Sequence, residues 1–390
     1  MASINLQGDT SGSISISAPS VAGSNTLTLP ATTQTLATQN SLGVRNLIIN
    51  GDMRIAQRGT SVTNVTGAGG YNTVDRWLWV EQSTATLDME QSTDVPTGQG
   101  FVNSVKLTVN TADASIASSD YSYYRQSIEG YNAAHLEFGT ANAKTITVSF
   151  WVKSNLTGTY CITLHNNTFT RSYIAEYTID SANTWEKKTI TIAGDTTGTW
   201  TTDNTRGLIL HFALATGTDS QGSLGWQANA KLGSSSQTNW LGTTSNYINI
   251  TGVQLEVGTE ATPFEVRPYD MELPRCKRYY EKSYPIGTLA GSAVIAGRRQ
   301  MGGSNVSGTT SFLSGPLITF EVEKITTPTI VLYDGSGNSG KCTRYQLGLG
   351  DSNNENVYTA DIGSTGLYTY SASGASRSGV GVHFTANAEL

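Results

Sequence analysis

Apolar residues fall at every second position over many short segments of this chain, which is the pattern of β-strands with one buried face. The segment 144–153 shows it most clearly, because its alternate positions hold Ile146, Val148, Phe150 and Val152. Residues 207–214 repeat the pattern. In 247–257 the apolar set moves from even to odd positions at Gly252, which predicts a β-bulge there. We therefore expect a two-sheet sandwich over residues 45–268.

The first 44 residues alternate differently, with serine and threonine on one face and isolated isoleucine or leucine on the other, as in 13–17 and 26–29. Their one charged side chain is Asp9. Strands of this kind cannot enclose a core by themselves. Residues 1–44 are therefore predicted to be an attachment and oligomerisation region that pairs with copies of itself or with a neighbouring protein.

Charge density rises sharply after the sandwich, since half of the 18 residues from Glu265 to Lys282 are ionic against 14% for the whole chain. Leu273, Cys276 and Tyr280 have helical spacing, which predicts a short helix near 271–281. A composition change of this size marks a boundary, so 269–283 is predicted to be a charged connector. Strand patterns return at 317–323 and 329–333, so 284–390 is predicted to be a smaller β domain.

Composition supports an all-β fold, because glycine alone accounts for 41 of 390 residues and strand-forming and turn-forming types dominate. The net charge of −6 argues against nucleic acid as a partner, since phosphate binding needs clustered lysine and arginine.

The chain start lacks the pattern of a signal peptide, and no stretch approaches the 18 apolar residues of a membrane span, so no membrane insertion is expected. Cys161, Cys276 and Cys342 are too far apart in sequence for a zinc ribbon and too few for a disulfide framework.

A series of short motifs, in order along residues 46–282, resembles a family of bacteriophage tail and fibre proteins. The motifs lie at 46–52, 57–60, 75–77, 125–130, 149–153, 185–186, 192–200, 250–258, 261–265 and 276–280. The resemblance implies a jelly roll similar to carbohydrate-binding modules, carried by virion proteins that are commonly trimeric. It implies no known catalytic set, so no catalytic residue is assigned.

These observations lead us to expect a non-enzymatic virion component that folds in the host cytoplasm. We expect a homotrimeric tail fibre or adhesin that binds a host surface glycan and contacts other virion proteins through its N-terminal region. One alternative is a purely structural fibre or decoration protein of the head or tail without a ligand. A further alternative is a glycan hydrolase of the tailspike kind, because two carboxylates brought together by folding leave no sequence signature.

Sugar binding needs aromatic rings beside hydrogen-bonding side chains. Trp226 and Trp240 each lie in a polar context of glycine, serine, glutamine and asparagine, and are the first candidates, as exposed loop platforms. Tyr123 and Tyr124 are the second pair. The alternative for each is packing inside the domain.

No cofactor or metal is expected. Asn50 and Asp52 offer too few oxygens for calcium and are predicted to form a turn. The glycines of 335–340 resemble a phosphate loop, but strand-like residues follow them, so we predict a hairpin turn.

Overall fold

The computed structural model describes residues 3–7, 11, 13–17, 44–67, 69–302, 313–346, 350–371 and 379–390. They divide between two compact units, 1–42 and 43–390. In the first unit, β1 (Ser3–Gln7) pairs with β2 (Ser13–Ser17) in an antiparallel hairpin that places Ile4 opposite Ile16. The predicted segment at 26–29 lies outside the described residues. A two-stranded hairpin of this kind is marginally stable alone.

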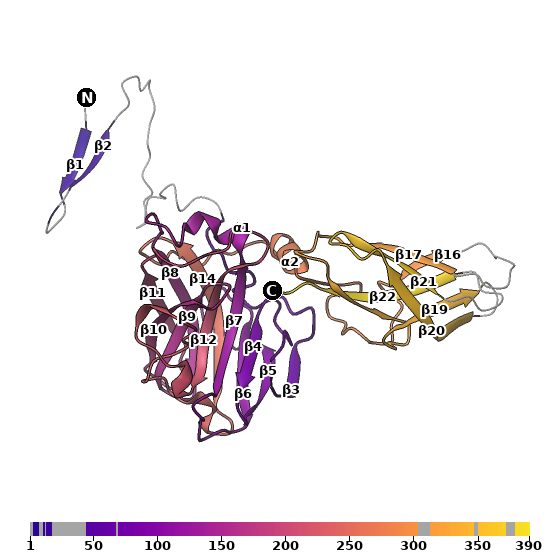
Figure 1. The fold of residues 1–390 in the computed structure, drawn as a ribbon, viewed down its shortest axis with the longest axis horizontal. Coiled ribbons are helices and arrows are strands. Elements are labelled where there is room, and N and C mark those ends of the chain that lie inside the picture. Colours follow the sequence, from indigo (N-terminus) through magenta and orange to yellow (C-terminus); the bar gives the residue numbers. More distant parts are fainter. Residues whose placement is uncertain are drawn as a thin grey trace. The chain divides into compact units, whose positions relative to one another are not determined.

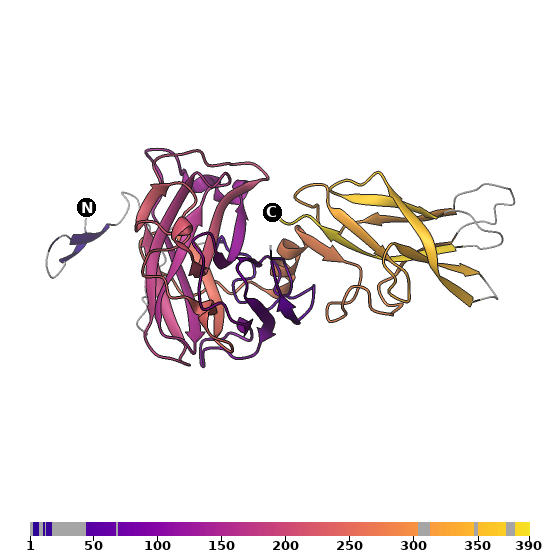
Figure 2. The ribbon, with the colours of Figure 1, turned by 60° about the horizontal axis from the view of Figure 1, so that its bottom comes forward.

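The second unit begins with a sandwich of two antiparallel six-stranded sheets (Figures 1 and 2). We call the first the front sheet; its strand order is β13 (Gly225–Ala228), β10 (Arg171–Ile179), β9 (Gly158–His165), β12 (Arg206–Thr216), β7 (Tyr121–Glu129) and β4 (Leu78–Gln82). The back sheet runs β11 (Glu186–Ile192), β8 (Ile146–Ser154), β14 (Tyr247–Val257), β6 (Ser104–Thr111), β5 (Thr86–Ser92) and β3 (Ser61–Val65). The predicted all-β sandwich is confirmed.

The core between the two sheets uses the alternation seen in the sequence. The four apolar residues of β8 predicted to share a face are fully buried in it. The bulge predicted in β14 is present, as a register shift between Thr251 and Gln254. Gly252 has a φ of 62°, and a side chain there would collide with the ring of Phe101, so glycine is required at this position.

Short helices occupy the connections of the sandwich. They are α1 (Gly130–Ala133) and the 3₁₀ turns η2 (Ala134–Leu136), η3 (Thr218–Ser220) and η4 (Trp240–Gly242). In the described part of the chain, no helix is long and apolar enough to cross a membrane.

The distal strands form a smaller β domain around β22 (Gly379–Asn387), with its own apolar core (Figure 1). The main sheet order is β15 (Tyr280–Lys282), β22, β19 (Lys341–Gln346), β20 (Gly350–Ala360), β21 (Gly366–Ser371) and β17 (Leu313–Thr319), while β16 (Arg299–Gly302) and β18 (Thr329–Tyr333) also pair with β22. Residues 334–340 form a tight turn from β18 into the strand β19, closed by a hydrogen bond from Gly340 N to Leu332 O (2.8 Å). The hairpin-turn prediction for this glycine-rich segment is confirmed.

A third buried region, which we call the junction, is made by residues 46–58 and 75–76, α2 (Tyr269–Lys277), residues 278–282 and the last residues 387–390. The predicted helix is present, two residues earlier than expected, with Pro274 inside it. Its charged neighbours are largely buried: Arg267 pairs with Glu272 (3.2 Å), Arg278 with Glu129 (2.7 Å) and Lys324 with Glu281 (2.6 Å). The high charge density of this stretch therefore reflects internal ion pairs.

Candidate functional site

Trp240 was predicted to be an exposed loop platform, and this prediction is wrong. Its side chain is fully buried in the sandwich core. The polar residues around Trp240 form hydrogen bonds with backbone groups of the protein: the Asn239 side chain donates to Asp113 O (2.9 Å), and the Asn246 side chain donates to Trp240 O (2.8 Å). These side chains therefore hold the loop closed over a buried ring, and no sugar can reach the ring.

Tyr123 and Tyr124 do not form a joint platform, because adjacent residues of β7 point to opposite faces of the sheet. Tyr124 faces the core, is fully buried and stacks on Trp77 with ring centres 5.3 Å apart. Tyr123 lies on the outer face, where it is 8% exposed and packs edge-on against His211. The prediction that Tyr123 and Tyr124 form one sugar site is therefore wrong.

Trp226 was predicted to be an exposed loop platform like Trp240, and this prediction is also wrong, because the residue is half-buried on the edge strand β13. Its indole N–H donates to Ala193 O (2.7 Å), and its ring makes edge contacts with Trp200 and Phe138 at 5.7 and 5.8 Å. Arg171 lies over the same ring. Trp226 therefore supports a cluster of aromatic rings at the corner of the sandwich.

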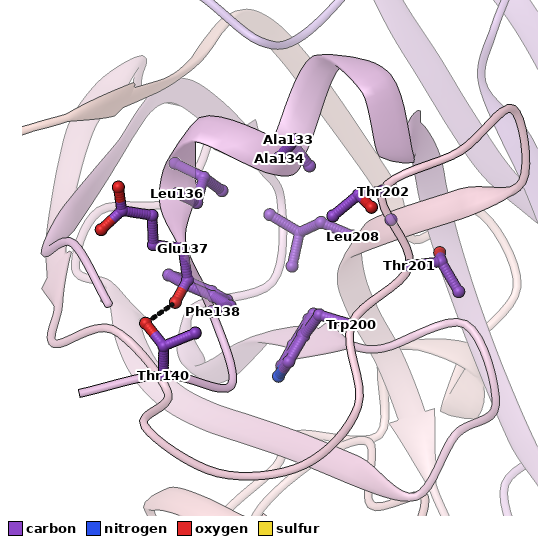
Figure 3. Close-up of a pocket in the computed structure, with 11 residues that line it drawn as sticks. Ala133, Ala134, Leu136, Glu137, Phe138, Thr140, Trp200, Thr201, Thr202 and Leu208 are labelled. Carbon is purple, nitrogen blue, oxygen red and sulfur yellow. Dashed lines mark hydrogen bonds between the residues drawn. The ribbon is translucent and has the colours of Figure 1, made fainter. Parts of the chain in front are cut away.

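A pocket of about 310 Å³ opens beside this cluster (Figure 3). Its walls are apolar and aromatic, formed by Phe138 and Trp200 together with Ala133, Ala134, Leu136, Gly207 and Leu208. Figure 3 shows Glu137 and Thr140 toward one end and Thr201 and Thr202 toward the other. Trp226 is not part of the pocket wall, but it packs against Trp200 and so helps to hold the Trp200 ring in place.

Two chain segments build this pocket, one at 130–140 and one at 200–208. Gly130 N donates to Thr205 O (2.8 Å) and Tyr131 N donates to Asp203 O (2.9 Å), which ties the segments together. A side chain at Gly130 would lie 2.7 Å from the carbonyl oxygens of Thr201 and Asp203, so this close approach requires glycine.

The Trp200 loop is held by a partly buried ion pair. Nε and Nη2 of Arg171 donate to the Asp195 carboxylate at 2.7 and 2.8 Å. Asp195 also accepts from the backbone and the hydroxyl of Thr197, while Trp200 donates its indole N–H to Thr197 O (3.1 Å). The Trp200 ring is thus preorganised, which reduces the entropy lost when a ligand binds.

The chemistry of the pocket suits a small polar molecule with an apolar face. Its volume is near the lower end of the range for small-molecule sites, about 300–1,000 Å³. Phe138 and Trp200 offer ring surfaces, three threonines contribute hydroxyls, and Glu137 supplies the one carboxylate of the wall. The hydroxyls of Thr140 and Thr201 already donate to Glu137 O (2.7 Å; Figure 3) and to Arg206 O (2.5 Å), so toward a ligand these two can act only as acceptors.

Sequence reasoning did not select Phe138 or Trp200 as site residues. Trp200 lies in a glycine- and threonine-rich segment, the same kind of context that drew attention to Trp226 and Trp240. The polar neighbours alone could not show which of these rings faces a cavity, because asparagine and threonine bind backbone groups as readily as ligands.

The metal candidates behave as a turn, as predicted. Asn50 has a φ of 58°, and its side chain bonds Ile55 N, Ile55 O and Asp75 O at 2.9–3.0 Å. Asp52 pairs with Arg54 (2.9 Å). Throughout the described ranges, no three His, Cys, Asp or Glu residues are placed to share a metal ion, and all three cysteines are buried and free.

No protein-family model and no curated protein matches the chain. Among solved structures it is similar to the enzymatically active domain of tailspike protein 4 of bacteriophage CBA120, at 15% identity and a TM-score of 0.30, over 50% of this chain and 22% of that one. It is also similar to a family 11 carbohydrate-binding module of Clostridium thermocellum (12% identity, TM-score 0.28, 50% of this chain and 99% of that one). A third is the xylan-binding domain of a Paenibacillus barcinonensis protein (8% identity, TM-score 0.25, 56% and 96%). Likenesses this distant say nothing about ligand or activity, and the resemblance to phage tail and fibre proteins stays a prediction.

Proposed function

We propose that this chain is a non-enzymatic component of a phage virion, a trimeric tail fibre or adhesin, and that its sandwich binds a host surface glycan. We place one sugar residue of that glycan in the pocket between segments 130–140 and 200–208. The observation that carries the proposal is the preorganised Trp200 ring in a wall that also holds Phe138 and three threonines. A pyranose has an apolar C–H face and a rim of hydroxyls, and this wall offers a surface for each.

Binding without hydrolysis is part of the proposal. Glycosidases of the common retaining and inverting kinds use a pair of carboxylates. The pocket wall contributes one, Glu137. Incubation with a bound oligosaccharide should release no new reducing ends; release of reducing ends that Glu137→Gln abolishes would favour the hydrolase alternative.

Weak contact at one pocket is compatible with firm attachment if three copies act together. Linked sites raise the overall affinity by about 10²–10⁴ without new contacts. The β1–β2 hairpin, whose strands pair only with each other among the described residues, is the segment we propose for assembly with other copies and with other virion proteins. A molar mass of one chain at micromolar concentration, measured by light scattering, would contradict the trimer.

The test of the sugar site is the variant Trp200→Ala, compared with Trp185→Ala. Trp185 is also half-buried, but it lies outside the pocket wall and its indole N–H donates to Asp94 (3.0 Å). Binding to a glycan array and adsorption to host cells should fall at least tenfold for Trp200→Ala and stay unchanged for Trp185→Ala. Folded variants that both bind as the unaltered protein does would reject the pocket, and an array without any bound glycan would favour the purely structural alternative.

A further inference from the structure

The outer face of the front sheet carries an unusual group of side chains. Tyr121, Tyr123 and Arg125 alternate along β7 on the side turned away from the core, and His211 of β12 lies opposite Arg125. Phe169, from the turn between β9 and β10, lies over this face. The guanidinium carbons of Arg125 and Arg206 lie 5.9 and 5.7 Å from the centre of its ring.

Neither arginine has an anionic partner in the part of the chain that the structure describes. Among the described residues, no ion pair and no hydrogen bond from a side chain reaches either guanidinium, and Nε of Arg125 is buried without an acceptor. Arg125 is 8% exposed. Because a buried charge is costly unless it is paired, this arrangement is unfavourable in the absence of an anion.

The carboxylates nearby are already neutralised by other groups. Glu129 accepts from both Nε and Nη2 of Arg278 (2.9 and 2.7 Å) and from the hydroxyl of Tyr279 (2.9 Å). Glu389 is bound by Arg58 and Arg76. These carboxylates therefore do not neutralise the positive charge of Arg125 and Arg206.

The two charges disfavour each other, and the neighbouring aromatic rings offset their cost only in part. Burial, followed by the charge of Arg125, holds the pKa of Arg206 below its ordinary value, although it remains a cation at neutral pH. Cation–π contact with Phe169 and Tyr123 lowers the cost of the two charges but cannot replace a counter-ion. Tyr121 and Arg206 are half-buried, so a ligand can reach the group from this side.

We infer that Arg125 and Arg206 bind the carboxylate of an acidic sugar, of the uronic acid type, at a second site on the front sheet. Guanidinium groups match a carboxylate through parallel N–H donors. The stacked rings of Tyr121 and Tyr123, 5.7 Å apart, offer the adjacent surface for the pyranose. The choice of a sugar as the carrier of the carboxylate rests on the proposed function.

The test uses the full chain and isothermal titration with four probes: methyl β-D-glucuronide, methyl β-D-glucoside, sodium acetate and inorganic phosphate. We expect the glucuronide to bind at least tenfold more tightly than each of the other three. Arg206→Gln should remove this preference, whereas Lys187→Gln should keep it. Lys187 is exposed on β11 of the back sheet, so its change removes the same charge at a distance.

Three other results would overturn the inference. Equal affinity for glucuronide and glucoside, or a preference that survives Arg206→Gln in a folded protein, would overturn the inference. Acetate or phosphate binding as tightly as the glucuronide would show a simple anion site and would also overturn it. Phe169→Leu is the second variant if Arg206→Gln fails to fold; it should weaken the preference.

Trp200→Ala separates this inference from the proposed function. If it abolishes glucoside binding and leaves the glucuronide preference intact, both sites stand. If it abolishes binding of both sugars while Arg206→Gln changes nothing, the proposed function stands and the second site falls. If Trp200→Ala changes nothing and Arg206→Gln removes the preference, the second site stands and the pocket falls.

Discussion

The sandwich core and the junction are both buried, but they are built from opposite kinds of side chain. The core is made of aliphatic and aromatic residues from two sheets, with Trp77, Trp79 and Trp240 among its largest members. The junction holds Arg76, Glu389, Glu272 and Asp75 together with a small apolar cluster around Cys276. Apolar packing tolerates small shifts, whereas a buried charge depends on its one partner. The two regions should therefore fail in different ways.

The largest expected effect is in the core. Trp240→Ala should lower the free energy of unfolding by about 3–5 kcal/mol, because it leaves a cavity where a buried indole was. Its indole N–H has no acceptor in the described part of the chain, so Trp240→Phe should cost clearly less. Chemical denaturation of the two variants measures both values. Equal losses would show that the N–H group, rather than the packed volume, is what matters at this position.

Removal of one charge from the junction should lower the free energy of unfolding. Arg76 is fully buried, lies over the Tyr279 ring, and is bound by Glu389 and by Ser127 O (2.7 Å). Glu389→Gln should therefore cost about 3 kcal/mol, because it leaves the arginine charge unpaired. The double variant Arg76→Met, Glu389→Met should cost less than Glu389→Gln alone. If the double variant is the less stable of the two, the ion pair itself stabilises the junction.

The smallest effect is that of pH, which should act on the outer face of the front sheet and on the junction in opposite directions. Burial lowers the pKa of His165 from 6.5 to about 3, and burial also holds that of His211 well below its usual range; the two rings bond each other at 2.9 Å. The unfolded chain binds protons that these folded rings exclude. Their contribution to stability is therefore complete above pH 6.5 and is lost as the pH falls toward 3.

In the junction, burial raises the pKa of Asp75 from 3.8 to about 6, so the folded state holds a proton that the unfolded state releases. This contribution is complete below pH 3.8 and is lost as the pH rises through 6. Hydrogen exchange at pH 4.5 and 7.5, corrected for intrinsic rates, should show β9 and β12 better protected at pH 7.5 and residues 50–58 better protected at pH 4.5. A parallel change in both regions would contradict the separation of their titrating groups.

Much of the sandwich could be predicted from the sequence, because a strand with one buried face shows a period of two whatever its partners are. The alternation at 146–152 and the shift at Gly252 are properties of single strands, and both predictions are confirmed. The turns at Asn50 and at 335–340 are equally local, and they too were predicted correctly.

Which residues form a site depends on contacts between segments that are distant in the chain. The sequence could not determine these contacts. Trp200, Trp226 and Trp240 have similar neighbours in the chain, yet one lines a pocket, one supports it and one is buried in the core. Their difference comes from which loops fold over which sheet edge. The ionic stretch at 265–282 shows the same limit: its charges are visible in the sequence, but their partners at Glu129, Glu321 and Lys324 are brought together only by the tertiary fold. Local periodicity thus determined the strands, while long-range pairing decided which aromatic and charged side chains remain available to a ligand.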